Sequence, residues 1–259
     1  MDTKLKLALI QSHLIWEDPK ANRTLFEEKI RAISRDVDLI ILPEMFSTGF
    51  TMNPENVEAE EGEKTVEWMK HVAKQQGTAV IGSIVFSEDK TNYNRLFFVD
   101  PNGNLKTYDK KHTFTLAGED KVYKAGTSKL VFEYLGFKIC PLICYDLRFP
   151  VWARNVEDYD VLIYVANWPK PRIEAWDTLL KARAIENMAY CVGVNRIGLD
   201  GLGYEYSGHS AVYDTLGNQI AYSEKEETLF ATLDKKHIDE TRAKLKFLED
   251  RDEFNLVKL

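Results

Sequence analysis

The spacing of apolar and polar residues predicts strands and helices from the start of the chain. In residues 4–11, leucines alternate with lysine and alanine before the run becomes fully apolar, which is typical of a strand. From Pro19 onward, apolar residues recur at helical spacing, which predicts a helix covering one face of a sheet. The short apolar run at 38–43 predicts a strand buried on both faces.

The same criteria predict alternating elements along the rest of the chain. Further strands are expected at residues 78–86, 93–99, 105–108, 129–134, 137–144, 160–166, 191–196, 210–214, 219–223 and 228–233. Further helices are expected at residues 63–75, 149–157, 172–190 and 235–247. The sequence Asp-Pro-Asn-Gly at 100–103 predicts a hairpin, and the last three strands resemble a meander. Long connections are expected at 45–61 and 109–126, and a glycine-rich loop at 197–207.

This order of elements indicates an α/β fold, because strand–helix units are mixed with hairpins. One mixed sheet and two sheets packed face to face with helices outside both fit the pattern. No linker, repeat or low-complexity segment interrupts residues 1–259, so a single domain is expected, with 235–259 as a C-terminal helix and tail. The helix at 172–190 has apolar residues around more than one face, which predicts contact with a partner chain.

Composition and charge narrow the class of protein. The 259 residues are 44% hydrophobic and 29% charged, as in ordinary globular proteins. The net charge of -7 comes from interspersed acidic and basic side chains, so we expect no nucleic-acid partner. The first residues lack the features of a signal peptide, and no apolar segment approaches the length of a membrane span. A cytoplasmic protein without a membrane partner is therefore expected.

The chain has three cysteines. An odd number in a chain too large to need disulfides for stability favours reduced thiols. If their segment is extended, the Cα atoms of Cys140 and Cys144 lie about 13 Å apart at about 3.3 Å per residue, beyond disulfide reach. No pair of cysteines or histidines has the spacing of a metal site, so we expect no metal.

Three buried strands are expected to end in polar or reactive residues, namely Glu44, Cys144 and Asn167. Loops beyond strand ends often carry chemistry in α/β proteins, so Cys144 is a candidate nucleophile. Taken singly, each candidate also has a structural interpretation. Cys144 fits a small core residue, Glu44 a helix cap, and the lysine pair that begins at Lys110 a solvated turn. Cys140 lies deeper on the same strand and is expected to be packing only.

Four motifs resemble, in order, the signature blocks of the nitrilase (carbon-nitrogen hydrolase) superfamily. They are Leu-Pro-Glu-Met-Phe at 42–46, Tyr-Asp-Lys-Lys-His at 108–112, Ile-Cys-Tyr-Asp-Leu-Arg-Phe-Pro at 143–150 and Ala-Arg-Ala-Ile-Glu-Asn at 182–187. Three shorter pieces resemble the ω-amidase branch, whose members hydrolyse the terminal amide of dicarboxylate monoamides such as 2-oxoglutaramate and 2-oxosuccinamate. These pieces are Phe-Ser-Thr-Gly-Phe at 46–50, Asn-Trp-Pro at 167–169 and Asn-Arg-Ile-Gly at 195–198.

The resemblance implies a single-domain α-β-β-α four-layer sandwich that forms a homodimer and uses no metal or organic cofactor. It implies that Cys144 is the nucleophile, Glu44 the general base and Lys110 the third catalytic residue. Glu119 matches a second glutamate that helps to position the site, although the neighbouring Asp120 offers a second carboxylate there. Lys110 and the backbone N–H of Tyr145 would form the oxyanion hole. These residue types suit amide hydrolysis, which needs a nucleophile, a proton shuttle and a positive group near the developing oxyanion.

The substrate of an ω-amidase carries a free carboxylate, which an arginine would bind. Arg148 is nearest in sequence to Cys144 and is the expected anchor, while Arg172 and Arg196 compete for the role. The expected walls of the pocket are aromatic: Phe50, Phe114 and Trp168.

Other functions fit part of the sequence. A carbamoylase or a nitrilase would use the same three catalytic residues with a different pocket. A hydrolase pairing Cys144 with His112 or His209, or a non-catalytic binding protein, would not need Glu44 as a base. For His112 itself, a structural hydrogen bond is the favoured interpretation.

Overall fold

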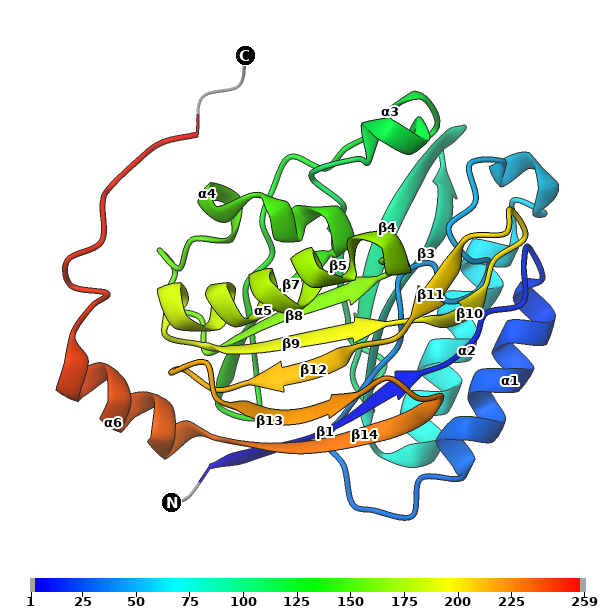
Figure 1. Ribbon diagram of the computed structural model, residues 1–259. Coiled ribbons are helices and arrows are strands. Elements are labelled where there is room, and N and C mark those ends of the chain that lie inside the picture. Colours follow the sequence, from blue (N-terminus) through cyan, green and yellow to red (C-terminus); the bar gives the residue numbers. More distant parts are fainter. Residues whose placement is uncertain (1–2, 257–259) are drawn as a thin grey trace.

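Two six-stranded sheets packed face to face form the centre of the computed structural model, which describes residues 3–256 (Figure 1). The inner strand pairs of the first sheet, β1–β2 and β2–β3, are parallel, and its other pairs are antiparallel. In spatial order its strands are β14 (Glu227–Asp234), β1 (Lys4–Gln11), β2 (Leu39–Ile41), β3 (Ala79–Glu88), β4 (Thr91–Val99) and β5 (Leu105–Asp109).

The second sheet repeats this arrangement, with parallel pairs β7–β8 and β8–β9 between antiparallel edges. In spatial order its strands are β13 (Gln219–Ser223), β12 (Ser210–Tyr213), β9 (Tyr190–Asn195), β8 (Val161–Ala166), β7 (Phe137–Ile143) and β6 (Phe132–Tyr134).

Helices cover the outer faces of both sheets, so the layers run α-β-β-α (Figure 1). The helices are α1 (Pro19–Arg31) and α2 (Glu61–Gln76) on the first sheet, α4 (Pro150–Ala153) and α5 (Ile173–Asn187) on the second, and α6 (Lys235–Leu245) after β14. Alternation along β1 explains the layering: Leu7 belongs to the core between the sheets, whereas Ala8 packs with Phe26 of α1 and Met69 of α2. The four-layer sandwich is thus confirmed, and the single mixed sheet is wrong.

Two connections differ from the sequence-based expectation. Residues 197–207 form a small hairpin of β10 (Ile197–Leu199) and β11 (Glu205–Ser207) instead of a loop. The Asp200 carboxylate accepts hydrogen bonds from the backbone N–H groups of Leu202 and Tyr204, both at 2.9 Å, and these bonds close the turn. The expected meander is also wrong, because β14 leaves the second sheet and pairs with β1 over its whole length.

Some predicted elements are shorter or more ordered than expected. The helix predicted at 149–157 ends at Ala153, because the Asn155 side chain bonds both backbone polar groups of Tyr159 and forms a turn. The predicted loop at 109–126 contains two short helices, η2 (Thr115–Ala117) and α3 (Glu119–Val122). The predicted tail extends to residue 259, so its last three residues lie outside the described part.

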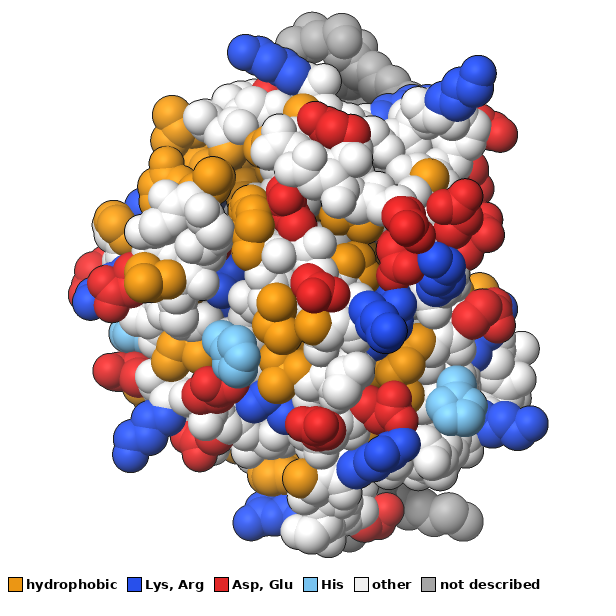
Figure 2. Space-filling view, turned by 90° about the vertical axis from the view of Figure 1, so that its right-hand side faces the viewer, with side chains coloured by type: hydrophobic (Ala, Val, Ile, Leu, Met, Phe, Trp, Pro, Cys, Tyr) orange, Lys and Arg blue, Asp and Glu red, His pale blue; other side chains and the backbone are white. Residues whose placement is uncertain are grey.

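The surface of the α1 side carries acidic and basic side chains interspersed (Figure 2). Within residues 3–256, no helix is long and apolar enough to span a membrane.

Candidate active site

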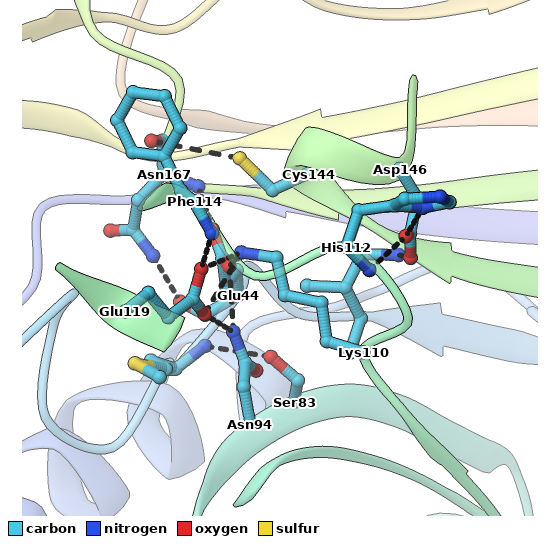
Figure 3. A network of polar contacts seen from close by, with 12 residues as sticks. Glu44, Ser83, Asn94, Lys110, His112, Phe114, Glu119, Cys144, Asp146 and Asn167 are labelled. Atoms are coloured by element: carbon cyan, nitrogen blue, oxygen red, sulfur yellow. Dashed lines mark hydrogen bonds and ion pairs between the residues drawn. The ribbon is translucent and has the colours of Figure 1, made fainter. Parts of the chain in front are cut away.

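The three strand ends singled out in the sequence meet between the two sheets (Figure 3). Glu44 follows β2 of the first sheet, whereas Cys144 and Asn167 follow β7 and β8 of the second. The backbone N–H of Asn167 donates to Glu44 Oε2 at 2.8 Å, and Asn167 Nδ2 donates to the Glu44 carbonyl at 2.6 Å. Cys144 Sγ lies 3.9 Å from the Asn167 carbonyl oxygen. The site therefore depends on both sheets.

Cys144 sits on a sharp turn between β7 and the short helix η3 (Cys144–Arg148). Its φ of 43° lies in the left-handed region, which is uncommon for a residue with a side chain and is often found at functional turns. The buried Asp146 carboxylate holds this turn. It accepts hydrogen bonds from the backbone N–H of Ile143 at 3.1 Å, the backbone N–H of His112 at 3.0 Å and the Tyr108 hydroxyl at 2.7 Å.

A buried cluster of charged side chains adjoins Cys144. Lys110 follows β5, and its Nζ donates to Glu44 Oε1 at 2.8 Å and to the two carboxylate oxygens of Glu119 at 2.8 and 3.0 Å. Glu119 is the first residue of α3. The Lys110 side chain is 1% exposed, and both carboxylates are fully buried. The four residues predicted to be catalytic are thus brought together.

Electrostatics in this cluster favour a lysine that stays protonated and a cysteine that rests as a thiol. Burial alone would lower the pKa of Lys110, but Glu119 and Glu44 outweigh it and raise that pKa. Burial raises the pKa of Glu119, while Lys110 opposes the shift. Burial, followed by the nearby Glu44 carboxylate, raises the pKa of Cys144 well above its ordinary value. A nucleophilic Cys144 therefore needs a base when it attacks.

A pocket of about 130 Å³ opens onto Cys144 and Lys110. All five residues expected to contact substrate line it: Phe50, Phe114, Tyr145, Arg148 and Trp168. Glu44 and Glu119 lie behind Lys110 and are not part of the lining. Such a volume suits a small molecule.

Two of the three candidate arginines lie in this pocket. The guanidinium carbon of Arg148 is 5.0 Å from the ring centroid of Trp168, and that of Arg172 is 5.2 Å from the ring centroid of Phe114. Neither arginine forms an ion pair within residues 3–256, and the lining contains no Asp or Glu. Arg196 is fully buried outside the lining and donates to backbone carbonyl groups, so it does not face the pocket.

The two histidines considered as partners for Cys144 lie elsewhere. His112 Nδ1 is 2.8 Å from Asp146 Oδ1, and its ring stacks on Phe149 with the centroids 3.6 Å apart. His209 Nδ1 is 2.9 Å from Asp177 Oδ2. Neither histidine lines the pocket, so the structure does not form a cysteine–histidine pair with Cys144. His112 has the structural hydrogen bond that the sequence favours.

Sequence reasoning missed several residues of the site. Tyr204 and Tyr206 of the β10–β11 hairpin line the pocket, but this segment was expected to be a loop. Asn94 of β4 contacts Glu44 and Glu119. A signal for Asn94 is present in the sequence, because it falls on the inward-facing row of β4 together with Leu96, and a polar residue is unusual there.

The structure also bears on metal binding. Within residues 3–256, no group of three or more His, Cys, Asp or Glu side chains has the arrangement of a metal site.

The fold and this pocket define a hydrolase of the nitrilase superfamily. Residues 6–243 match the carbon-nitrogen hydrolase family, and the chain belongs to that family. It is similar to the omega-amidase YafV of Escherichia coli K12, with 42% identity over 97% of this chain and 98% of the relative. It is also similar to a 2-oxoglutaramate amidase of Bacillus subtilis, with 32% identity over 95% of this chain and 97% of the relative.

A solved structure agrees with these relatives. The protein XC1258 of Xanthomonas campestris, described as a CN-hydrolase superfamily protein with an arsenic adduct in the active site, superimposes with a TM-score of 0.94. It is 39% identical, and the match covers 98% of this chain and 99% of that protein.

Proposed function

We propose that the protein is a cysteine-dependent amidase that hydrolyses the terminal amide of dicarboxylate monoamides, such as 2-oxoglutaramate or succinamate, and releases ammonia. The observation that carries this proposal is the pocket itself. It joins Cys144, next to a buried Glu44–Lys110 pair, with two arginines that form no ion pair with any carboxylate of the described residues 3–256. The names of the E. coli and B. subtilis relatives support the same class of substrate.

In the first half of the reaction, Glu44 removes the thiol proton of Cys144 as sulfur attacks the amide carbon. The positive charge of Lys110 and the backbone N–H of Tyr145 stabilise the tetrahedral oxyanion. The C–N bond then breaks, and Glu44 returns the proton to the departing nitrogen, which leaves as ammonia. The acyl group remains on Cys144 as a thioester.

In the second half, Glu44 takes a proton from water as the water attacks the thioester carbon. The C–S bond breaks, the proton returns to sulfur, and the free acid leaves. Glu119 does not contact the substrate in this scheme. Its two hydrogen bonds to Lys110 hold the ammonium beside Glu44.

In this scheme, the residues around the open part of the pocket select the substrate. Arg148 and Arg172 bind the free carboxylate, and their positions over Trp168 and Phe114 hold the two guanidinium groups in place. With Phe50, these two aromatic residues form apolar walls for the carbon chain of the substrate.

A substrate panel tests the proposal. Ammonia release is measured with 2-oxoglutaramate, succinamate, glutamine, asparagine, a nitrile and a carbamoyl compound. Turnover of the first two is expected to exceed that of the others. Faster release from the carbamoyl compound or the nitrile would instead identify a carbamoylase or a nitrilase.

Two variants test the catalytic roles. Cys144→Ala is expected to abolish turnover without loss of fold, as measured by circular dichroism. Glu44→Gln is expected to reduce kcat by about 100-fold or more, because it removes the base. An active Cys144→Ala variant contradicts the nucleophile, and a fully active Glu44→Gln variant favours a base other than Glu44.

We also propose a homodimer. Val151 of α4 and Ile185 of α5, on the outer helical layer, are about half exposed (50% and 46%), and the resemblance implies dimers. Light scattering after gel filtration is expected to give twice the chain mass, and Ile185→Glu is expected to give monomers. A monomeric wild-type protein contradicts this assembly.

We propose a cytoplasmic location from the three free, buried cysteines. We also propose that the protein does not bind nucleic acid. Cell fractionation tests the location, and retention on DNA or RNA would contradict the second statement.

A further inference from the structure

Asn94 lies beneath the charged cluster and connects its two carboxylates (Figure 3). It belongs to β4, is 1% exposed, and faces the core between the sheets in the same row as Leu96. Its Nδ2 donates to Glu44 Oε1 at 2.8 Å and to Glu119 Oε1 at 3.1 Å. Both amide hydrogens are therefore used by the two carboxylates.

The backbone of Asn94 contacts the third charged residue. Its carbonyl oxygen accepts a hydrogen bond from the backbone N–H of Lys110 at 3.0 Å. Asn94 thus contacts the strand end that carries Lys110 and one oxygen of each carboxylate, whose other oxygens accept hydrogen bonds from the backbone N–H groups of Asn167 and Phe114. In contrast, Asn94 Oδ1 is buried and accepts no hydrogen bond from residues 3–256. The two hydrogen bonds from Nδ2 to the carboxylates orient the amide.

The charge balance explains why a neutral double donor suits this position. The cluster contains two carboxylates and one ammonium, all buried. The three N–H groups of Lys110 already point to Glu44 and Glu119. Two ionised carboxylates near each other repel, and further donors without a negative charge reduce that cost. An aspartate at the same place would have the same shape, but it would add a third negative charge and no donor.

We propose that Asn94 is a positioning residue that keeps Glu44 ionised and oriented to take the proton of Cys144. Its side chain faces Glu44, Glu119 and the ammonium of Lys110, and the charges of this cluster also act on the thiol of Cys144 and the phenol of Tyr123. The proposal rests on the proposed role of Glu44 as base. It can be measured without an amide substrate of the enzyme, through the rate at which Cys144 is alkylated.

The main variant is Asn94→Asp, and the control is Asn92→Asp. Asn92 is two residues away on the same face of β4, and it accepts a hydrogen bond from Ser87 instead of contacting the carboxylates. For each protein, the rate of Cys144 alkylation by iodoacetamide is measured against pH, with mass spectrometry to separate this thiol from the fully buried Cys140 and Cys191. The pH dependence of kcat/KM is measured in parallel.

In Asn94→Asp, we expect the midpoint of the alkylation profile to rise by about one pH unit or more, because a third carboxylate adds negative charge near a thiol whose pKa is already raised by burial and by the Glu44 and Glu119 carboxylates. Activity at pH 7 is expected to fall by roughly 10-fold or more and to recover in part as the pH rises. The Asn92→Asp control is expected to keep the wild-type midpoint.

A milder variant, Asn94→Ser, covers the case in which Asn94→Asp does not fold. Serine offers a single donor, so kcat is expected to fall by roughly 10-fold while KM changes less than about twofold. The proposal is overturned by a folded Asn94→Asp protein with an unchanged midpoint, by an equal shift in Asn92→Asp, or by wild-type kinetics in folded Asn94→Ser. If the profiles shift as expected but no monoamide is hydrolysed, the proposed substrate fails and the role of Asn94 stands.

Discussion

Removal of each pocket arginine in turn tests how the substrate is recognised. In Arg148→Ala and Arg172→Ala, the carboxylate of succinamate loses one charged hydrogen-bond donor group. The aromatic rings beneath the two guanidinium groups remain, so the walls of the pocket are preserved. The loss of kcat/KM is therefore expected to be larger for a negatively charged amide than for a neutral one.

The size of the effect follows from the exposure of each arginine. A hydrogen bond to a charged group contributes about 1.5–3 kcal/mol, and about 1.4 kcal/mol corresponds to a factor of ten. Arg148 is exposed and Arg172 is half-buried, so water screens Arg148 more strongly. We expect kcat/KM for succinamate to fall about 10-fold in Arg148→Ala and roughly 100-fold in Arg172→Ala.

The assay compares ammonia release from succinamate with that from butyramide, a neutral amide of similar length. The ratio of the two kcat/KM values is expected to fall in both variants, mainly through a higher KM for succinamate. Arg35→Ala is the matched control, because Arg35 also lies over an aromatic ring, 4.6 Å from the Phe230 centroid, but outside the pocket. Equal losses for both amides, or an unchanged KM for succinamate in both pocket variants, would refute the reasoning.

Two further predictions concern stability. In Gly126→Ala, the new Cβ would lie 2.1 Å from the Asp109 carbonyl oxygen, so the backbone must move. Calorimetry is expected to show that the free energy of unfolding falls by about 1–3 kcal/mol. An unchanged Tm contradicts this prediction. Glu226 is partly buried, which opposes ionisation, but hydrogen bonds from Lys29 and His13 lower its pKa to about 2. This stabilisation is present above the ordinary pKa of 4.5 and is lost as the pH falls towards about 2. In urea unfolding, the free energy of unfolding of Glu226→Gln is therefore expected to be about 0.2–1 kcal/mol lower than that of the wild type at pH 7. This difference is expected to disappear near pH 2. A difference that persists at pH 2 contradicts a stabilising ion pair.

The periodic elements could be predicted from the sequence because their residues face the core. The strand predicted at 4–11 matches β1, and the run at 38–43 contains β2. The partner of each strand was harder to predict. β14 follows β13 in the chain but pairs with β1 from the other end of the sequence. Local alternation says which face of a strand is buried but not which strand lies beside it.

The residues of the active site likewise fall into those that the local sequence pattern reveals and those that only the fold brings together. Glu44, Cys144 and Asn167 could be found because they follow apolar runs, and the motif resemblance added Lys110. Asn94 could not be found in this way, because it lies within a strand instead of after one. Its importance comes from contacts with residues 50 and 25 positions away in the chain, which only the folded structure brings together.

The pairing of β1 with β14 also bears on the synthesis of the chain. Residues 12–226 separate β1 from its partner, so β1 leaves the ribosome well before residues 227–234 do. Until then, one edge of β1 has unpaired backbone groups beside fully buried leucines, which is the kind of edge that recruits strands from other chains. A polypeptide released before residue 227 would keep this open edge. The nascent chain therefore has a long interval in which a chaperone that covers β1 would prevent aggregation.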